Sequence, residues 1–426
     1  MCRKDAKALV SGRTVRRSRH SLRSLRRPGT MMGIKEFAMT GTKSVRPLYL
    51  MFVALCYARA VMGEILHFPD SYQFKEWLIS YAGGFIRRGL AGELLFDLCP
   101  PTAISLLLPM LLLLCALFVA ARICHRLAGL RLGAFWNVAL LLSPGLLLFC
   151  LQDISCLRRE IVCYAVLVAS LELCRRDAPA KPKLAAICAL TWLMLLIYEP
   201  FAVWIPLLMW GLRQASGTRA ALIYALAAIV PLAFIVATPS DPKQADLIVS
   251  AWRSAFPSLA TSPYDPFSYI GISAGDYYQG YSRFWPLRHF CKCLIAGCFL
   301  IFLPFALLYS SKLVAIRDRV SFLPPALVIL TPLFAMLPLG YDMGRWLNFS
   351  GMTALLVLCY FSERTQKPES SAHDADETGA REGERKSLAA WLMLACYLLG
   401  WHLKEIGPVV QLGNFDQYLG LADLFR

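Results

Sequence analysis

Two acidic side chains are the best candidates for proton transfer. Glu199 stands inside a largely apolar stretch, 195–204, where loss of water should raise its pKa unless a cation is near. A carboxyl group with a raised pKa suits general acid or base chemistry near neutral pH. Asp342 has Arg345 three residues away and should stay ionised as electrostatic support. We predict Glu199 as the catalytic carboxylate and Asp342 as the second candidate; the alternative for each is an ion pair that only supports the fold.

Five arginines have the chemistry to hold a phosphate, because the planar guanidinium matches its oxygens in pairs. These predicted phosphate-binding residues are Arg87, Arg88, Arg158, Arg159 and Arg345. The glycine pair at 83–84 predicts a helix start at Phe85, with the first two arginines in its first turn, where the positive helix end attracts anions. The alternatives are lipid headgroup binding by the first two and a local ion pair of the next two with Glu160. Further acidic candidates are Asp70, Glu93 and Glu160.

These residues stand in a chain with the composition of a membrane protein. Hydrophobic residues make up 57% and charged residues 17% of 426 positions, and mean hydropathy is +0.52. Apolar runs such as 103–121 reach the roughly 20 residues that a membrane span requires. We predict an all-α transmembrane bundle of about eleven spans, with an interfacial helix in the first outer loop. The expected spans are 48–65, 102–121, 134–151, 161–174, 184–198, 201–212, 220–238, 290–310, 322–339, 346–361 and 387–402.

Most of the formal net charge of +16 comes from the segment 1–47, which holds thirteen basic and two acidic residues. Such a tail before a first span most simply stays in the cytoplasm and contacts anionic membrane lipid. We therefore expect no nucleic-acid partner and a cytoplasmic N-terminus, in what is most simply a bacterial inner (plasma) membrane. The cysteines lie mostly in apolar runs, and no metal-ligand pattern or cofactor is specified.

The distribution of charge along the loops predicts the topology. With the N-terminus inside, the short inner loops hold twelve basic and two acidic residues, against six basic residues in the short outer loops. This threading places loops 66–101 and 239–289 outside, together with the candidate residues. It also predicts a helical hairpin whose tip is Glu199-Pro200. The transmembrane core is then 48–361, followed by a disordered inner linker at 362–386 and by a last span with an outer C-terminal segment at 387–426.

Two short motifs resemble a group of bacterial polytopic membrane proteins. They are Gly-Phe-Ile-Arg-Arg-Gly-Leu at 84–90 and Asp-Met-Gly-Arg-Trp at 342–346. The group is similar in layout to exopolysaccharide and O-antigen polymerases and to membrane glycosyltransferases that use polyprenyl-linked sugars. The resemblance implies transfer from a polyprenyl-(pyro)phosphate-linked glycan at the outer face. The acidic pair usual in the first outer loop of such transferases has only a loose substitute here, Asp70 and Glu76.

Two other function classes fit the same sequence. A transporter or flippase for a glycan or lipid is indicated by the proline-rich span at 322–339, which could form a broken helix. A non-catalytic assembly subunit would use the outer charged residues only for internal ion pairs. Charges in both leaflets would favour transport, whereas charges confined to one face favour an outer-face enzyme, and the predicted threading leans toward the enzyme.

Overall fold

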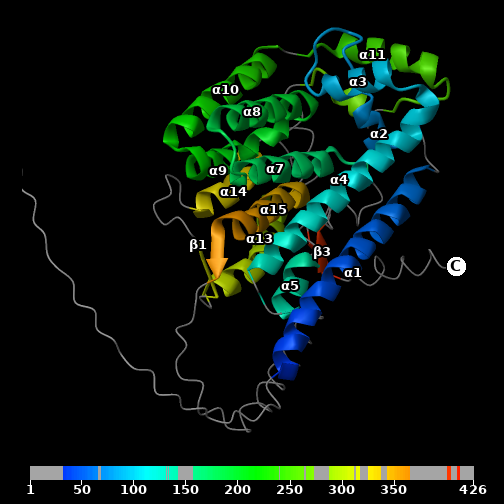
Figure 1. Cartoon of the computed structure of the whole chain (residues 1–426). Helices are drawn as coiled ribbons and strands as arrows, with labels where there is room; N and C mark the ends of the chain where they lie inside the picture. The colour runs from blue at the N-terminus through cyan, green and yellow to red at the C-terminus, as the bar shows by residue number, and fades with distance from the viewer. Residues whose placement is uncertain are drawn as a thin grey trace, which may run out of the picture.

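The computed structural model is a bundle of helices with two small antiparallel sheets (Figure 1). The described residues are 32–65, 69–130, 132, 134–142, 157–238, 240–262, 265–272, 287–310, 313–316, 325–336, 343–364, 401–403 and 410–412. The α-helices are α1 (Met32–Ile65), α2 (Tyr72–Trp77), α3 (Gly89–Leu98), α4 (Pro101–Gly129), α5 (Ala134–Leu141), α7 (Arg159–Arg175), α8 (Ala180–Ile197), α9 (Ile205–Ser216), α10 (Thr218–Ala237), α11 (Pro242–Ala255), α13 (Leu287–Ser310), α14 (Pro325–Met336) and α15 (Met343–Phe361).

In the described part of the chain, the remaining elements are two 3-10 helices and four short strands. The 3-10 helices are η1 (Glu199–Trp204) and η2 (Pro266–Tyr269). Strand β1 (Val314–Ile316) pairs antiparallel with β2 (Ser362–Arg364), and β3 (Trp401–Leu403) pairs antiparallel with β4 (Val410–Leu412). The end of the expected span 387–402 therefore lies in a strand, and the rest of that span lies outside the described residues.

Among the described residues, three helices are long and apolar enough to cross a membrane: α4, α8 and α10. Their outward faces carry large apolar side chains exposed on the protein surface. On α10 these are Leu222, Ile223, Leu226, Ile229, Val230, Phe234 and Val236. A continuous apolar face of this size would be unfavourable in water, whereas a bilayer solvates it. The prediction of a mostly helical protein is confirmed, and these three helices are candidate membrane spans. The total of about eleven spans stays a prediction.

Helix α7 lies inside the bundle and packs against α4, α8 and α9. Aromatic rings join it to η1 and α15: Tyr164 on α7 contacts Trp204 at 5.6 Å and Phe349 at 6.1 Å between ring centroids. The indole of Trp204 also donates a hydrogen bond of 2.9 Å to the hydroxyl of Thr353. These side chains are fully buried, so α7, η1 and α15 form one packed unit.

The predicted helix break at Glu199-Pro200 is present. Helix α8 ends at Ile197, Tyr198 is extended, and η1 begins at Glu199. Proline has no backbone N–H and cannot continue an α-helical hydrogen-bond ladder, so the chain tightens into a 3-10 turn before α9. Helices α8 and α9 both pack against α10, and the break leaves Glu199 between them in the chain.

The first predicted outer loop folds differently from its prediction at one point. Helix α3 begins at Gly89, not at Phe85, so Arg87 and Arg88 precede the helix instead of lying in its first turn. The cause is the backbone of Arg88, whose φ of 68° is left-handed and incompatible with an α-helix. Gly84 also has a positive φ, 98°, and no helix forms between these two residues.

The two predicted outer loops pack against each other at one end of the bundle, where Figure 1 shows α2, α3 and α11 together. The indole of Trp252 on α11 donates a hydrogen bond of 2.6 Å to the carbonyl of Leu78. The amide of Gln244 donates to the carbonyls of Gly83 and Phe85, each at 3.2 Å. Because Trp252 is fully buried, this contact holds the two loops together inside the protein.

Replacing Gly92 by alanine is expected to destabilise the protein by about 1–3 kcal/mol. Helix α3 crosses the backbone of 78–79 so closely that a Cβ at Gly92 would lie 2.1 Å from the carbonyl oxygen of Ile79. Gly129→Ala, at the end of α4, is the matched control because a Cβ there meets nothing within 4 Å. Thermal unfolding of the purified proteins measures both; equal melting temperatures for the two variants would contradict the close packing of α3.

Candidate functional site

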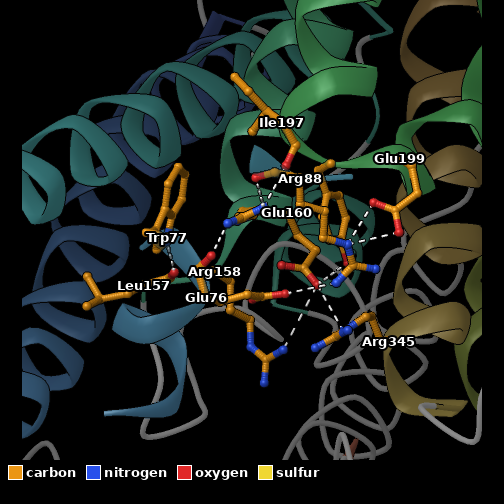
Figure 2. A network of polar contacts seen from close by, with 11 residues as sticks. Glu76, Trp77, Arg88, Leu157, Arg158, Glu160, Ile197, Glu199 and Arg345 are labelled. Carbon is orange, nitrogen blue, oxygen red and sulfur yellow. Dashed lines mark hydrogen bonds and ion pairs between the residues drawn. The ribbon is translucent and has the colours of Figure 1, made fainter. Parts of the chain in front are cut away.

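The centre of the candidate site is an arginine held between two glutamates. The Nε of Arg88 donates to both carboxylate oxygens of Glu199, at 2.9 and 2.7 Å. Its Nη1 donates to Glu76 at 3.2 Å, and its guanidinium lies over the ring of Tyr198, 5.1 Å from the ring centroid. Figure 2 shows this pair within a larger network of charged side chains. The first loop, α2 and η1 thus meet at one guanidinium.

A second group in the same network surrounds Glu160, in the first turn of α7. The Nε of Arg345 lies 2.9 Å from its carboxylate, and Arg158 lies 4.0 Å from it (Figure 2). The hydroxyl of Tyr198 donates to the same carboxylate at 3.0 Å. Since Tyr198 also packs under Arg88, it connects the two groups of charges.

Arg159 binds backbone carbonyls from three separate segments. Its guanidinium donates to the carbonyl of Ile197 at 2.7 Å, to that of Arg88 at 3.2 Å, and to that of Glu76. It also lies over the ring of Trp77, 5.3 Å from the centroid. Arg159 is fully buried. It therefore fixes the end of α2, the left-handed turn at Arg88 and the end of α8 relative to one another.

Within this network, the Arg88–Glu199 pair is the part most open to a ligand. Their side chains are 27% and 20% exposed, whereas Arg158, Arg159 and Glu160 are almost completely buried. Burial would raise the pKa of Glu199, but the charge and hydrogen bonds of Arg88, followed by the charge of Arg87, outweigh it and hold the pKa below its usual value. The sequence predicted a raised pKa for Glu199 only if no cation is near, and the structure places Arg88 beside it. Glu199 is ionised at neutral pH.

The pKa of Arg88 moves in the complementary direction. Burial would lower it, but the charge and hydrogen bonds of Glu199 and the charge of Glu76 raise it above its usual value. The two shifts agree on a charged, hydrogen-bonded pair.

The other predicted residues lie in different places. Arg87 is exposed beside the network, and Asp342 lies outside the described residues. Asp70 lies elsewhere, 3.5 Å from the ammonium of Lys75, and Glu93 accepts a hydrogen bond of 2.8 Å from the backbone N–H of Tyr81. Of the loose acidic pair in the first loop, only Glu76 joins the network.

No protein-family model, curated protein or solved structure matches the chain. The network itself therefore has to indicate the chemistry. Its four arginines exceed its three glutamates (Arg88, Arg158, Arg159 and Arg345; Glu76, Glu160 and Glu199), which favours an anionic ligand over a cation. Within the part of the chain that the structure describes, no group of three or more histidine, cysteine, aspartate or glutamate side chains could hold a metal ion.

Sequence reasoning missed a buried ion pair between the two predicted outer loops. The ammonium of Lys75 donates to both carboxylate oxygens of Asp265, at 3.1 and 3.2 Å, and both residues are buried. The pair joins α2 to η2, and it explains why Asp70 and Lys75 belong to a separate cluster. A sequence offers no direct signal for a partner 190 positions away.

A second missed cluster lies at the other end of α7. Glu172 accepts hydrogen bonds from Arg126, at 3.0 Å from Nε, and from the hydroxyl of Tyr360 at 2.8 Å, while Arg122 lies 3.9 Å away. The signal was present in the sequence: a glutamate inside the apolar run 161–174 and two arginines one helical turn apart. Charged groups are thus found at both ends of α7, about 18 Å apart along the helix from Glu160 to Glu172.

Proposed function

We propose that the chain is a membrane-embedded glycosyltransferase or glycan polymerase that acts on a polyprenyl-(pyro)phosphate-linked sugar at the outer face of a bacterial inner membrane. The observation that carries the proposal is the Arg88–Glu199 pair, a partly exposed guanidinium beside an ionised carboxylate. The first can hold a phosphate and the second can accept a proton. The apolar helices α4, α8 and α10 supply the membrane setting that a polyprenyl lipid requires.

In the proposed reaction, the acceptor hydroxyl attacks the anomeric carbon of the donor sugar. The new bond joins that carbon to the acceptor oxygen, and the bond from the same carbon to the phosphate oxygen breaks. Glu199 takes the hydroxyl proton, and the leaving phosphate carries away the bonding electron pair. Arg88, with the exposed Arg87 beside it, stabilises the negative charge that develops on this phosphate.

Donor binding has a further effect on Glu199 in this mechanism. The single N–H at Nε of Arg88 now points at Glu199 and cannot point at a donor phosphate at the same time. In this mechanism the phosphate replaces the carboxylate as the acceptor of that hydrogen bond. Glu199 then loses the contact that lowers its pKa most, while burial continues to raise it. The carboxylate of Glu199 becomes a stronger base only when the donor is bound. Proton removal from the acceptor is therefore favoured only in the donor-bound protein.

The pH dependence of transfer tests this coupling. Because Glu199 works as the carboxylate, activity falls as pH drops through its pKa. In the free protein that pKa is below the ordinary glutamate value of about 4.3, so kcat/KM should hold until the pH is below about 4.3. The fall in kcat, which reports the loaded site, should come at higher pH. If kcat and kcat/KM fell at the same pH, the replacement of Glu199 by phosphate would be contradicted. Glu93→Gln, outside the network, is the control and should leave both pH profiles unchanged.

Binding of a polyprenyl phosphate by the purified protein tests the donor site directly. Native mass spectrometry should show the complex for the wild type and a loss of about tenfold or more for Arg88→Gln, which removes a charge-assisted, bidentate contact. Arg253→Gln, on α11, is the control, because this arginine contacts the backbone of Leu259 and lies outside the network. Equal binding by the wild type and Arg88→Gln would reject the proposed phosphate site.

Transport of a glycan or lipid is the second candidate, and the Glu172 cluster is the observation that favours it. That cluster places charged side chains at the second end of α7, whereas an outer-face enzyme needs them only at the first. Purified protein in detergent distinguishes the two functions, since transfer of sugar needs no membrane-separated compartments and transport does. Sugar transfer in detergent supports the enzyme, and movement of a labelled lipid-linked glycan across vesicles without transfer supports the transporter.

A further inference from the structure

One face of α4 is an exposed apolar stripe that ends at an arginine. Its side chains recur every three or four residues, the spacing of neighbours on one face of a helix, and they are Leu107, Leu111, Leu114 and Phe118. Arg122 follows one turn later, with its guanidinium 6.0 Å from the centroid of the Phe118 ring and its side chain 36% exposed. The stripe and the charge therefore share one surface.

The length of α4 places this arginine near a membrane surface. The helix has 29 residues and is about 43 Å long, whereas the hydrocarbon layer is about 30 Å thick. If the apolar run 102–121 fills the hydrocarbon layer, Arg122 begins the headgroup region. A lipid alongside the stripe would have its acyl chain on the leucines and its phosphate level with Arg122.

The charges beside Arg122 are positive in excess. Arg126 lies one helical turn away on α4, and both arginines form ion pairs with Glu172. Glu172 is already held by Arg126 and by the Tyr360 hydroxyl, and its distance of 3.9 Å from Arg122 is that of a loose ion pair. Arg175 donates to the backbone carbonyl of Tyr360 at 2.9 Å. An anionic group at this position would meet a positive surface that Glu172 offsets only in part.

We propose that this face of α4 binds an anionic phospholipid, with an acyl chain along the stripe and the headgroup phosphate on Arg122. The site is separate from the Arg88–Glu199 network and does not depend on the proposed transfer reaction. Its occupant is a structural or regulatory lipid of the bilayer. Such a lipid would add to the contacts that hold the α4–α7–α15 junction together.

Native mass spectrometry of the purified protein tests the site. The protein is given phosphatidylglycerol and phosphatidylcholine with the same acyl chains, and the ratio of bound lipids is measured. The wild type should prefer phosphatidylglycerol, and Arg122→Gln should reduce that preference about fivefold, the effect of one basic side chain at an anionic membrane surface. Arg122→Lys keeps the charge and should keep most of the preference. Arg219→Gln, an exposed arginine at the start of α10, should leave it unchanged.

Four outcomes would overturn the proposal. An unchanged ratio of bound lipids in Arg122→Gln would show that Arg122 does not bind the headgroup. An equal loss in Arg219→Gln would show a diffuse charge effect instead of a site. Complete displacement of phosphatidylglycerol by an equal concentration of inorganic phosphate, or a dimer without bound lipid, would show that the stripe holds no lipid chain.

Discussion

Glutamine in place of Glu199 is expected to lower sugar transfer by about 10²–10⁴-fold while the protein is produced at normal levels. The change is nearly isosteric, and the amide oxygen can still accept a hydrogen bond from the Nε of Arg88. What is lost is the group that takes the acceptor proton. The measurements are glycan output in cells, normalised to protein level, and the initial rate of the purified protein.

Glu93→Gln is the matched control for this experiment. Glu93 belongs to the same end of the bundle but accepts a backbone hydrogen bond from Tyr81, outside the arginine network, so transfer should stay within about twofold of wild type. Full output from Glu199→Gln at normal protein levels would make Glu199 a structural partner of Arg88. The proposed mechanism would then be wrong, although phosphate binding by Arg88 could still hold.

Lysine in place of Arg159 is expected to destabilise the fold by on the order of 4 kcal/mol, because hydrogen bonds from a charged donor contribute roughly 1.5–3 kcal/mol each and do not add fully. The planar guanidinium of Arg159 donates hydrogen bonds to the carbonyls of Ile197, Arg88 and Glu76. One lysine nitrogen cannot reach three acceptors in that geometry, so buried carbonyls would remain unpaired. Thermal unfolding in detergent should show a melting temperature lower by roughly 10 °C.

The same variant separates positioning from ligand binding, because lysine keeps the positive charge. If Arg159 mainly contacts phosphate, as its type and position predict, Arg159→Lys should unfold near the wild-type temperature and bind polyprenyl phosphate less well. If it mainly positions the three segments, stability should fall first. Arg87→Lys, at an exposed side chain, should melt within about a degree of wild type. A wild-type melting temperature for Arg159→Lys would reject the positioning role.

The helical elements around the site could be predicted because their signals are local. The apolar run beginning near 102 became α4, and the Glu199-Pro200 pair became the break between α8 and α9. Arg158 and Arg345 could be assigned to one region because each stood just before an expected span, 161–174 or 346–361, on the same predicted side. The structure brings both to Glu160. The placement of Asp342 stays a prediction.

The individual contacts could not be predicted, because they depend on backbone geometry and on distant residues. The sequence pattern favoured a helix through Arg87 and Arg88, yet Arg88 adopts a left-handed conformation that its contacts with Glu76 and Glu199 help to maintain. The direction of the Glu199 pKa shift depends on that same conformation, since it brings the guanidinium to the carboxylate. Lys75 and Asp265 show the same limit: each charge is evident, but their pairing is not.

Helix α7 is fixed by ionic clusters at both ends, and this restricts how the protein can move. Arg159 and Glu160 join its first turn to the surrounding loops, while Glu172 joins its last turns to α4 and α15. Sliding or tilting α7 alone would break several buried charge contacts at once, each costing roughly 1–3 kcal/mol. Large motions should therefore carry α7, η1 and α15 as one rigid body. Opening of the Arg88–Glu199 site would then require motion of the turn around Gly84 and of α11, which contacts this turn through Gln244.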